Sequence, residues 1–321
     1  MLVRQLFMVT AIVGCLFHAS ASLTSAQQDT GRDELAKKSQ TDISSVQRQA
    51  RNGDAVAEYR LGRSYMMGIV VSQNFREAAK WFRRSAAQGS RDAEFALGYL
   101  FEQGQGVARD YKQAVFYYAA AANQGQPTAE NNLGSMYENG KGVPKDLHQA
   151  ATWYQKAAGH GEVTAQCNLA TLYFRGHGVP QNYAQAAAWF RAAAERGYAP
   201  AQENLAWMYY TGTGITLDFG AAATWVRTAA NQGYARAQLD LAYLYEQGKG
   251  VPLDYFAAYI WYKAATNGGE QRARARLKAL SNLLSNEQIR KANDAAAKLS
   301  FSSIHATTSS NDIASSFGVR R

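Results

Sequence analysis

Two short stretches of the sequence combine glycine and lysine in the manner of a phosphate-binding loop: Gly140-Lys141-Gly142 and Gly248-Lys249-Gly250. A phosphate loop of the GxxxxGKS/T type needs a wider glycine spacing and a preceding strand, and neither is present. The stretch also occurs twice, which a single catalytic loop has no reason to do. The pattern therefore predicts turns rather than a nucleotide site, and no cofactor is expected.

Histidine and cysteine are the other residues that could carry chemistry. His148, His160 and His177 share no metal-ligand spacing, so we interpret them as solvated residues. Cys167 has no basic neighbour in sequence that would activate it, which favours a partly buried, unreactive thiol over a nucleophile. The Ser-x-x-Lys, Gly-x-Ser-x-Gly and His-Glu-x-x-His motifs are absent. The sequence therefore predicts a protein without catalytic activity and without a metal site.

Glycine recurs along the chain with one fixed period of 36 residues. Self-similarity at such a period is typical of a solenoid, in which each repeat is one supersecondary unit. The period defines six repeats over residues 53–268 without an insertion. The glycines that mark it are Gly53, Gly89, Gly125, Gly161, Gly197, Gly233 and Gly269.

The first half of each repeat predicts a helix, which we call helix A. In the third repeat its face is formed by Ala129, Leu133, the small Gly134 and Tyr137, at helical spacing. The small residue allows a neighbouring helix to approach closely. Gly140 then ends the helix, because glycine takes the left-handed conformation at little cost.

The second half of each repeat predicts a second helix, helix B. In the third repeat Asp146 is placed to cap it and Gln149 completes a capping-box pattern. A large aromatic residue follows at a fixed position, and we expect these rings to form the core. They are Trp81, Tyr117, Trp153, Trp189, Trp225 and Trp261.

Both ends of the chain depart from the repeat. Residues 1–26 combine Arg4, a short apolar run and small-residue cleavage sites near Ala21 or Ala26, which indicates a secretory signal peptide and a secreted or periplasmic location. A lipoprotein anchored at Cys15 is the lesser alternative. We expect a polar linker over 27–41, an N-terminal capping helix over 42–52, C-terminal capping helices over 269–299 and a disordered Ser/Thr-rich tail over 300–321. No other apolar run is long enough to cross a membrane.

The net charge of +9 does not indicate a nucleic-acid partner. Residues 53–268 hold 19 Lys and Arg against 17 Asp and Glu, so the repeats are nearly neutral and the excess lies mainly at the C-terminal end. A nucleic-acid binder would carry a basic stripe along its working surface.

The recurring pattern Ala-x-x-x-Leu-Gly/Ala-x-x-Tyr-x-x-Gly-x-Gly, followed by Ala-x-x-Trp, closely resembles the Sel-one-like repeat (SLR) family, a relative of tetratricopeptide repeats. The resemblance covers residues 53 to about 280. It implies an all-α solenoid, a right-handed superhelix of antiparallel helix pairs, and a role as an adaptor in protein complexes. Some cysteine-rich members are credited with β-lactamase-like activity, but this sequence lacks their repeated cysteine pairs.

By analogy with tetratricopeptide proteins, helix A would line the concave surface and bind the partner. Its non-core stripe runs through the positions seven and ten residues after each repeat glycine, starting with Arg60 and Arg63. Asn there could grip an extended peptide, or could instead bond to a neighbouring helix within the repeat. The predicted groove residues are Tyr99, Asn132, Asn168, Asn204, Trp207, Asp240 and Tyr243.

The sequence thus predicts a non-catalytic secreted or periplasmic scaffold whose groove binds a protein or peptide partner, with a regulatory or envelope-related role. Two alternatives remain open. One is a cell-envelope polysaccharide-associated factor, since groove aromatics also suit sugars. The other is a β-lactamase-like hydrolase.

Overall fold

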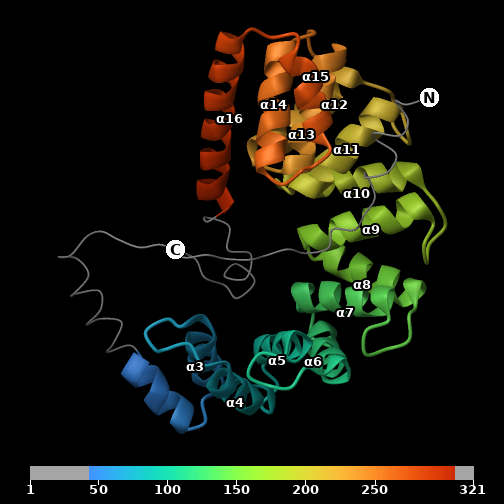
Figure 1. Cartoon of the computed structure of the whole chain (residues 1–321). Coiled ribbons are helices and arrows are strands. Elements are labelled where there is room, and N and C mark those ends of the chain that lie inside the picture. Colours follow the sequence, from blue (N-terminus) through green and yellow to red (C-terminus); the bar gives the residue numbers. More distant parts are fainter. Residues whose placement is uncertain (1–42, 308–321) are drawn as a thin grey trace. The chain divides into compact units, whose positions relative to one another are not determined.

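A computed structural model describes residues 43–307, and every regular element in that part of the chain is a helix (Figure 1). The protein is an all-α solenoid of helix pairs, as predicted. The described chain divides into two compact units, which meet in sequence between Glu162 and Val163. This division falls between the third and fourth repeats, so that each unit holds three of them.

The first unit begins with a helix over residues 43–51, and three helix pairs follow it. In each pair, helix A and helix B of one repeat lie against each other. Within the unit, helix B of the first and of the second repeat also contacts helix A of the repeat that follows. The pairs are α3 (Ala55–Met67) with α4 (Phe75–Ala86), α5 (Arg91–Gln103) with α6 (Tyr111–Asn123), and α7 (Pro127–Asn139) with α8 (Leu147–Gly159).

The second unit contains three further pairs and two closing helices. The closing helices both pack on α14, the last helix B. The pairs are α9 (Val163–Arg175) with α10 (Tyr183–Glu195), α11 (Ala199–Thr211) with α12 (Phe219–Asn231), and α13 (Ala235–Gln247) with α14 (Tyr255–Asn267); the closing helices are α15 (Ala273–Ser281) and α16 (Asn286–Thr307).

The helix ends follow the capping residues read from the sequence. In the third repeat, the Asp146 carboxylate accepts hydrogen bonds from the backbone N–H groups of His148, at 2.9 Å, and Gln149, at 3.0 Å. These bonds satisfy donors that a helix start leaves unpaired. Gly140 ends α7 with a φ of 67°, in the left-handed region. The Gly-Lys-Gly stretch is therefore a helix end and a turn.

In the first three repeats, one aromatic ring of helix B lies over the small glycine of helix A. A Cβ atom added to Gly134 would lie 2.8 Å from Cδ1 of Tyr154, so the glycine is required for this approach. The Tyr154 hydroxyl donates a hydrogen bond of 2.7 Å to Glu138 at the end of the same helix A. Tyr118 and Tyr262 bond Glu102 and Glu246 in the same way, so in three repeats the buried ring joins the two helices both by packing and by a hydrogen bond.

This arrangement corrects the prediction that the tryptophan slot forms the core. Among the six rings in that slot, only Trp81 is buried, at 9% exposure; the other five are half-buried. The fully buried side chain is the next residue along helix B, because that position faces the helix A partner directly. This slot holds Phe82, Tyr118, Tyr154, Phe190, Val226 and Tyr262.

Within each unit, neighbouring repeats contact each other through the second glycine of a turn, which is Gly106 or Gly142 in the first unit and Gly214 or Gly250 in the second. A Cβ atom at Gly106 would overlap the carbonyl group of Phe75, which starts helix B of the preceding repeat. Gly142 has the same relation to Tyr111. The backbone of the turn thus lies directly on the backbone of the preceding helix, and a side chain there would separate the two repeats.

The two ends of the described chain are closed by extra helices. At the first end, Val46 and Ala50 belong to an apolar cluster with Leu61 of the first repeat. At the other end, Ser285 and Gln288 form the reciprocal hydrogen bonds of a capping box at the start of α16.

Helix α16 continues to Thr307, past the end that the sequence predicted near Leu299. Residues 300–307 contain neither glycine nor proline, so nothing in that stretch stops the helix. The predicted signal peptide, the linker and the rest of the predicted tail lie outside the described residues. No helix within residues 43–307 has the length and apolar character that a membrane span requires.

Candidate partner-binding surface

The predicted groove residues all lie on A helices, but they differ in what surrounds them. Tyr99 and Asn132 belong to the first unit. The other five lie in the second unit: Asn168, Asn204, Trp207, Asp240 and Tyr243.

In the first unit, Asn132 connects two neighbouring repeats. Its side chain hydrogen-bonds the hydroxyl of Tyr118 on α6, which in turn donates to Glu102 at 2.8 Å. Burial raises the pKa of Tyr118 well above its ordinary value, and Glu102 adds to the effect. Tyr99 lies beside the same group, and burial raises its pKa as well. Asn132 thus supports the alternative reading, in which asparagine bonds to an adjacent helix.

In the second unit, Asn204 is engaged within its own helix, where its side-chain amide donates a 3.0 Å hydrogen bond to the carbonyl of Pro200. Asn168 is half-buried on α9. Neither residue occupies the centre of an apolar core, and both retain a solvent-facing part.

Trp207 lies over two core clusters of the second unit, with its ring edge-on to Phe174 at a centroid distance of 5.4 Å. The ring is half-buried. Its indole Nε1–H is buried and finds no hydrogen-bond acceptor among the described residues. An unpaired buried donor costs free energy, so this tryptophan differs from an ordinary packing residue.

Asp240 lies in a cluster of charges rather than on an open surface. Its carboxylate forms no ion pair or hydrogen bond with a described residue, whereas the nearby Glu203 pairs with Arg236 at 3.1 Å and Glu270 pairs with Arg272 at 2.6 Å. Burial, followed by the charge of Glu203, raises the pKa of Asp240 well above its ordinary value. Burial also raises the pKa of Glu203, against the opposing effect of Arg236.

Tyr243 is a core residue. Only 3% of its surface is exposed, and its hydroxyl bonds that of Tyr210, which accepts a 3.0 Å hydrogen bond from Lys249 Nζ. The ring therefore offers no face to a partner in this structure. Periodicity alone could not reveal this, because the equivalent Tyr99 is half-buried.

The residues considered for catalysis are placed apart. His160 Nδ1 lies 2.8 Å from the buried carboxylate of Glu130, within one repeat, and Cys167 is fully buried on α9. Across residues 43–307, no group of three histidine, cysteine or acidic side chains could hold a metal ion.

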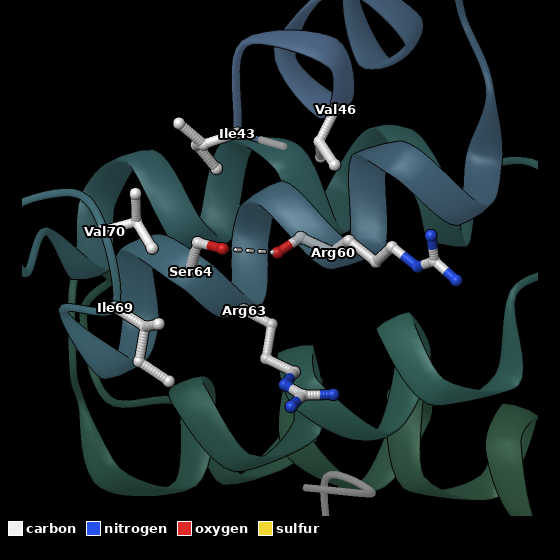
Figure 2. Close-up of a pocket in the computed structure, with 7 residues that line it drawn as sticks. All are labelled: Ile43, Val46, Arg60, Arg63, Ser64, Ile69 and Val70. Atoms are coloured by element: carbon white, nitrogen blue, oxygen red, sulfur yellow. Dashed lines mark hydrogen bonds between the residues drawn. The ribbon is translucent and has the colours of Figure 1, made fainter. Parts of the chain in front are cut away.

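Sequence reasoning missed one feature, a pocket of about 360 Å³ at the start of the first unit (Figure 2). Arg60 and Arg63, which begin the predicted stripe, line it together with Ser64 of the same helix. Its apolar walls come from the helix over 43–51 and from the turn after α3. The signal in the sequence is the first turn, where a valine replaces the second glycine; the apolar residues are Ile43, Val46, Ile69 and Val70.

Comparison with known proteins identifies the family. The Sel1 repeat model matches six consecutive segments: 55–90, 91–126, 127–162, 163–198, 199–234 and 235–270. The chain therefore belongs to the Sel1 repeat family, whose fold typically serves protein–protein interaction. The matched segments reproduce the 36-residue period, and the third of them ends at residue 162, where the first unit ends.

Solved structures agree with this assignment. A protective antigen present in uropathogenic Escherichia coli strains, which displays an SLR fold, is 33% identical with a TM-score of 0.73. The match covers 82% of this chain and 56% of the antigen, so the chain spans little more than half of that protein. A Sel1 repeat protein from Oxalobacter formigenes is 29% identical with a TM-score of 0.66, over 72% of this chain and 93% of its own. Among curated proteins, none matches the sequence.

Proposed function

We propose that this protein is a non-catalytic, secreted or periplasmic scaffold that binds a protein or peptide partner along its A helices. The observation that carries the proposal is a contrast within the repeat. The core alanine and leucine positions of helix A keep the same residue in every repeat, whereas the positions seven and ten residues after the repeat glycine vary. Nine of the twelve residues at these two positions are at least partly exposed, and Ala96, Thr171 and Tyr243 are buried. Such a surface suits recognition, because its polar and aromatic groups are not all needed to hold the fold.

Trp207 is the central residue of this proposal. It is the tryptophan outside the helix B slot, and its indole donor lacks an acceptor. A partner carbonyl that takes up this hydrogen bond after a small ring rotation recovers the cost of the unpaired group. The half-buried Asn168 and Asn204 provide donors and acceptors along the same series of helices.

A comparison of conservative variants tests the proposal. The mature protein, immobilised, captures its partner from an envelope extract of the native host. Trp207→Phe with Asn168→Ala keeps most of the packing on Phe174 but removes the indole donor and one amide, and should lower partner recovery severalfold. Trp225→Phe is the matched control, because Trp225 is half-buried in the same unit but lies in the helix B slot.

Equal recovery by the double variant and the wild type, with unchanged melting temperatures, would reject the assigned surface. Robust hydrolysis of nitrocefin or peptidoglycan by the pure protein would favour the hydrolase instead. Glycan-array binding that depends on Trp207 would favour the polysaccharide-associated factor.

The proposed location rests on the first 26 residues of the sequence. N-terminal sequencing of the protein recovered from the envelope or medium should give a chain that starts at Ser22 or Gln27. A chain that starts at a lipid-modified Cys15 would support the lipoprotein alternative, and an unprocessed Met1 would contradict export.

A further inference from the structure

The pocket at the start of the first unit has an apolar side and a cationic side. Ile43 and Val46 come from the first helix, and Ile69 and Val70 come from the turn after α3; the last two are each 46% exposed. In Figure 2 the guanidinium groups of Arg60 and Arg63 extend away from that turn. An exposed apolar surface next to two neighbouring arginines is unusual for a terminal repeat, whose outer face is normally polar.

The turn explains why this pocket is open. Val70 holds the position that glycine holds in the other five repeats, and it keeps the left-handed φ of 66° that glycine would have. At Gly106 and Gly142 a side chain would strike the preceding repeat. Val70 faces no such neighbour among the described residues, so its isopropyl group projects into the pocket instead. A valine with a positive φ is strained, and glycine would suit this backbone conformation better. The valine is therefore explained by its side chain and not by the backbone conformation.

The first repeat is also the most cationic part of the repeat array. Residues 55–90 contain six Lys and Arg against two Asp and Glu, whereas residues 91–270 contain 13 against 15. Some of these cations are paired inside the repeat, as Arg84 is with Glu58 at 2.7 Å. The guanidinium of Arg60, by contrast, forms no ion pair or hydrogen bond with a described residue. The Arg60 charge beside the pocket therefore has no counter-ion among the described residues.

We propose that this pocket binds an acidic segment of a partner protein, which inserts one bulky apolar side chain beside Ile69 and Val70 and places a carboxylate on Arg60. The inference rests on the proposed function, because Arg60 and Arg63 begin the same stripe of helix A, and it adds the chemical class of the partner. Charge complementarity selects an acidic segment, and the concave apolar wall selects a single side chain rather than a flat lipid surface.

Selection from a library of displayed random peptides tests this inference directly. Against the wild-type mature protein, the library should yield a consensus with Asp or Glu next to Leu, Ile, Phe or Met. The best peptide is then synthesised with a fluorophore, and a second version carries Asn and Gln in place of its acids. Arg60→Glu should weaken binding of the acidic peptide by about tenfold, and raised salt should weaken it further.

A matched control separates the pocket from general charge. Arg76→Glu makes the same charge change on an exposed residue of the same repeat outside the pocket, and should leave affinity within about twofold at physiological salt. Val70→Gly provides a second control. Glycine suits the positive φ, so the melting temperature should stay the same or rise while peptide affinity falls severalfold. A purely structural role for Val70 would not separate these two readouts.

Several results would overturn the inference. They are a consensus without acids, no consensus at all, or equal loss of affinity in Arg60→Glu and Arg76→Glu. Binding to vesicles with phosphatidylglycerol but not to peptides would assign the patch to a membrane surface. A dimer that dissociates on Arg60→Glu would assign it to a second copy. If the native partner still depends on Trp207 but not on Arg60, the pocket inference fails while the scaffold proposal stands.

Discussion

The two units share one repeat but join their neighbouring helices with different chemistry. In the first unit, Phe95 and Asn132 occupy two adjacent positions of the repeat in successive A helices. Phe95 packs on Tyr118 at 6.0 Å between ring centroids, and Asn132 bonds the hydroxyl of the same tyrosine. In the second unit, the equivalent positions carry the carboxyl groups of Glu203 and Asp240.

Equivalent positions of the repeat can therefore carry different polar groups where two neighbouring repeats meet, although the helical spacing is the same. An amide can both donate and accept, so Asn132 is satisfied at any ordinary pH. The buried carboxyl group of Glu203 and the half-buried one of Asp240 repel each other when both are charged, and Arg236 forms an ion pair with Glu203. The first unit should therefore be nearly insensitive to pH in this region, and the second should not.

The largest effect that we predict concerns the buried ring that both units use. Tyr154→Ala should destabilise the first unit by about 3–5 kcal/mol, because it empties a fully buried site and removes a hydrogen bond. Trp153→Ala, at the adjacent half-buried position, should cost about half as much. Urea unfolding followed by circular dichroism measures both. A larger loss for Trp153→Ala would restore the original view of the tryptophan slot.

Asp240→Asn should stabilise the second unit by about 1 kcal/mol at pH 8, because it removes a half-buried charge that desolvation and the charge of Glu203 disfavour. The folded state raises the pKa of Asp240, so the wild-type contribution is complete below the ordinary aspartate value and falls as pH rises toward the raised value. The variant should flatten that dependence. The reciprocal Asn132→Asp should introduce a similar dependence into the first unit.

Thermal melts across pH 4 to 9 measure both variants. If wild type and Asp240→Asn show the same pH dependence of the melting temperature, the carboxyl groups of Glu203 and Asp240 do not control the pH dependence of the second unit.

Gly134→Ala should destabilise the first unit by about 1 kcal/mol. The clash with the Tyr154 ring exceeds the gain in helix propensity, which is about 1 kcal/mol. The second unit offers the opposite test at Ala170, which already carries a methyl group beneath Phe190. Ala170→Gly should also destabilise, through lost propensity. If Gly134→Ala instead stabilised the protein, α7 and α8 would have to move apart at little cost to accommodate the added methyl group.

The smallest effect should come from Tyr118→Phe, which keeps the ring but removes the hydroxyl that Asn132 and Glu102 share. We expect a loss of about 1 kcal/mol in urea unfolding. In an Asn132→Ala background the same change should cost less, since the two groups act through one bond. Additive losses would contradict the bond between the repeats.

Local patterns predicted most of the fold. The period, the caps such as Asp146, the helix-ending glycines and the Ser285–Gln288 box depend on interactions within one turn of chain, which spacing reveals directly. The deepest ring of helix B was missed because Trp153 and Tyr154 are adjacent and both aromatic. Which of them faces helix A depends on the angle between the two helices, and a one-dimensional pattern does not contain it.

The candidate site was less predictable for the same reason. Glu203 and Asp240 lie in different repeats, and their approach is a property of the stack. Tyr99 and Tyr243 occupy one repeat position but differ in burial because their neighbours differ. The pocket of the first unit required knowledge of what the second glycine contacts in the other repeats, which only the structure reveals.

The central claim is that the variable face of the A helices holds the partner. Crosslinking of the mature protein in its native host, followed by mass spectrometry, tests this claim most directly. We predict that the partner's crosslinks concentrate on the A helices, including α3, α5 and α11, and that they diminish in Trp207→Phe. Contacts confined to the exposed side of the B helices, unchanged by that variant, would contradict it.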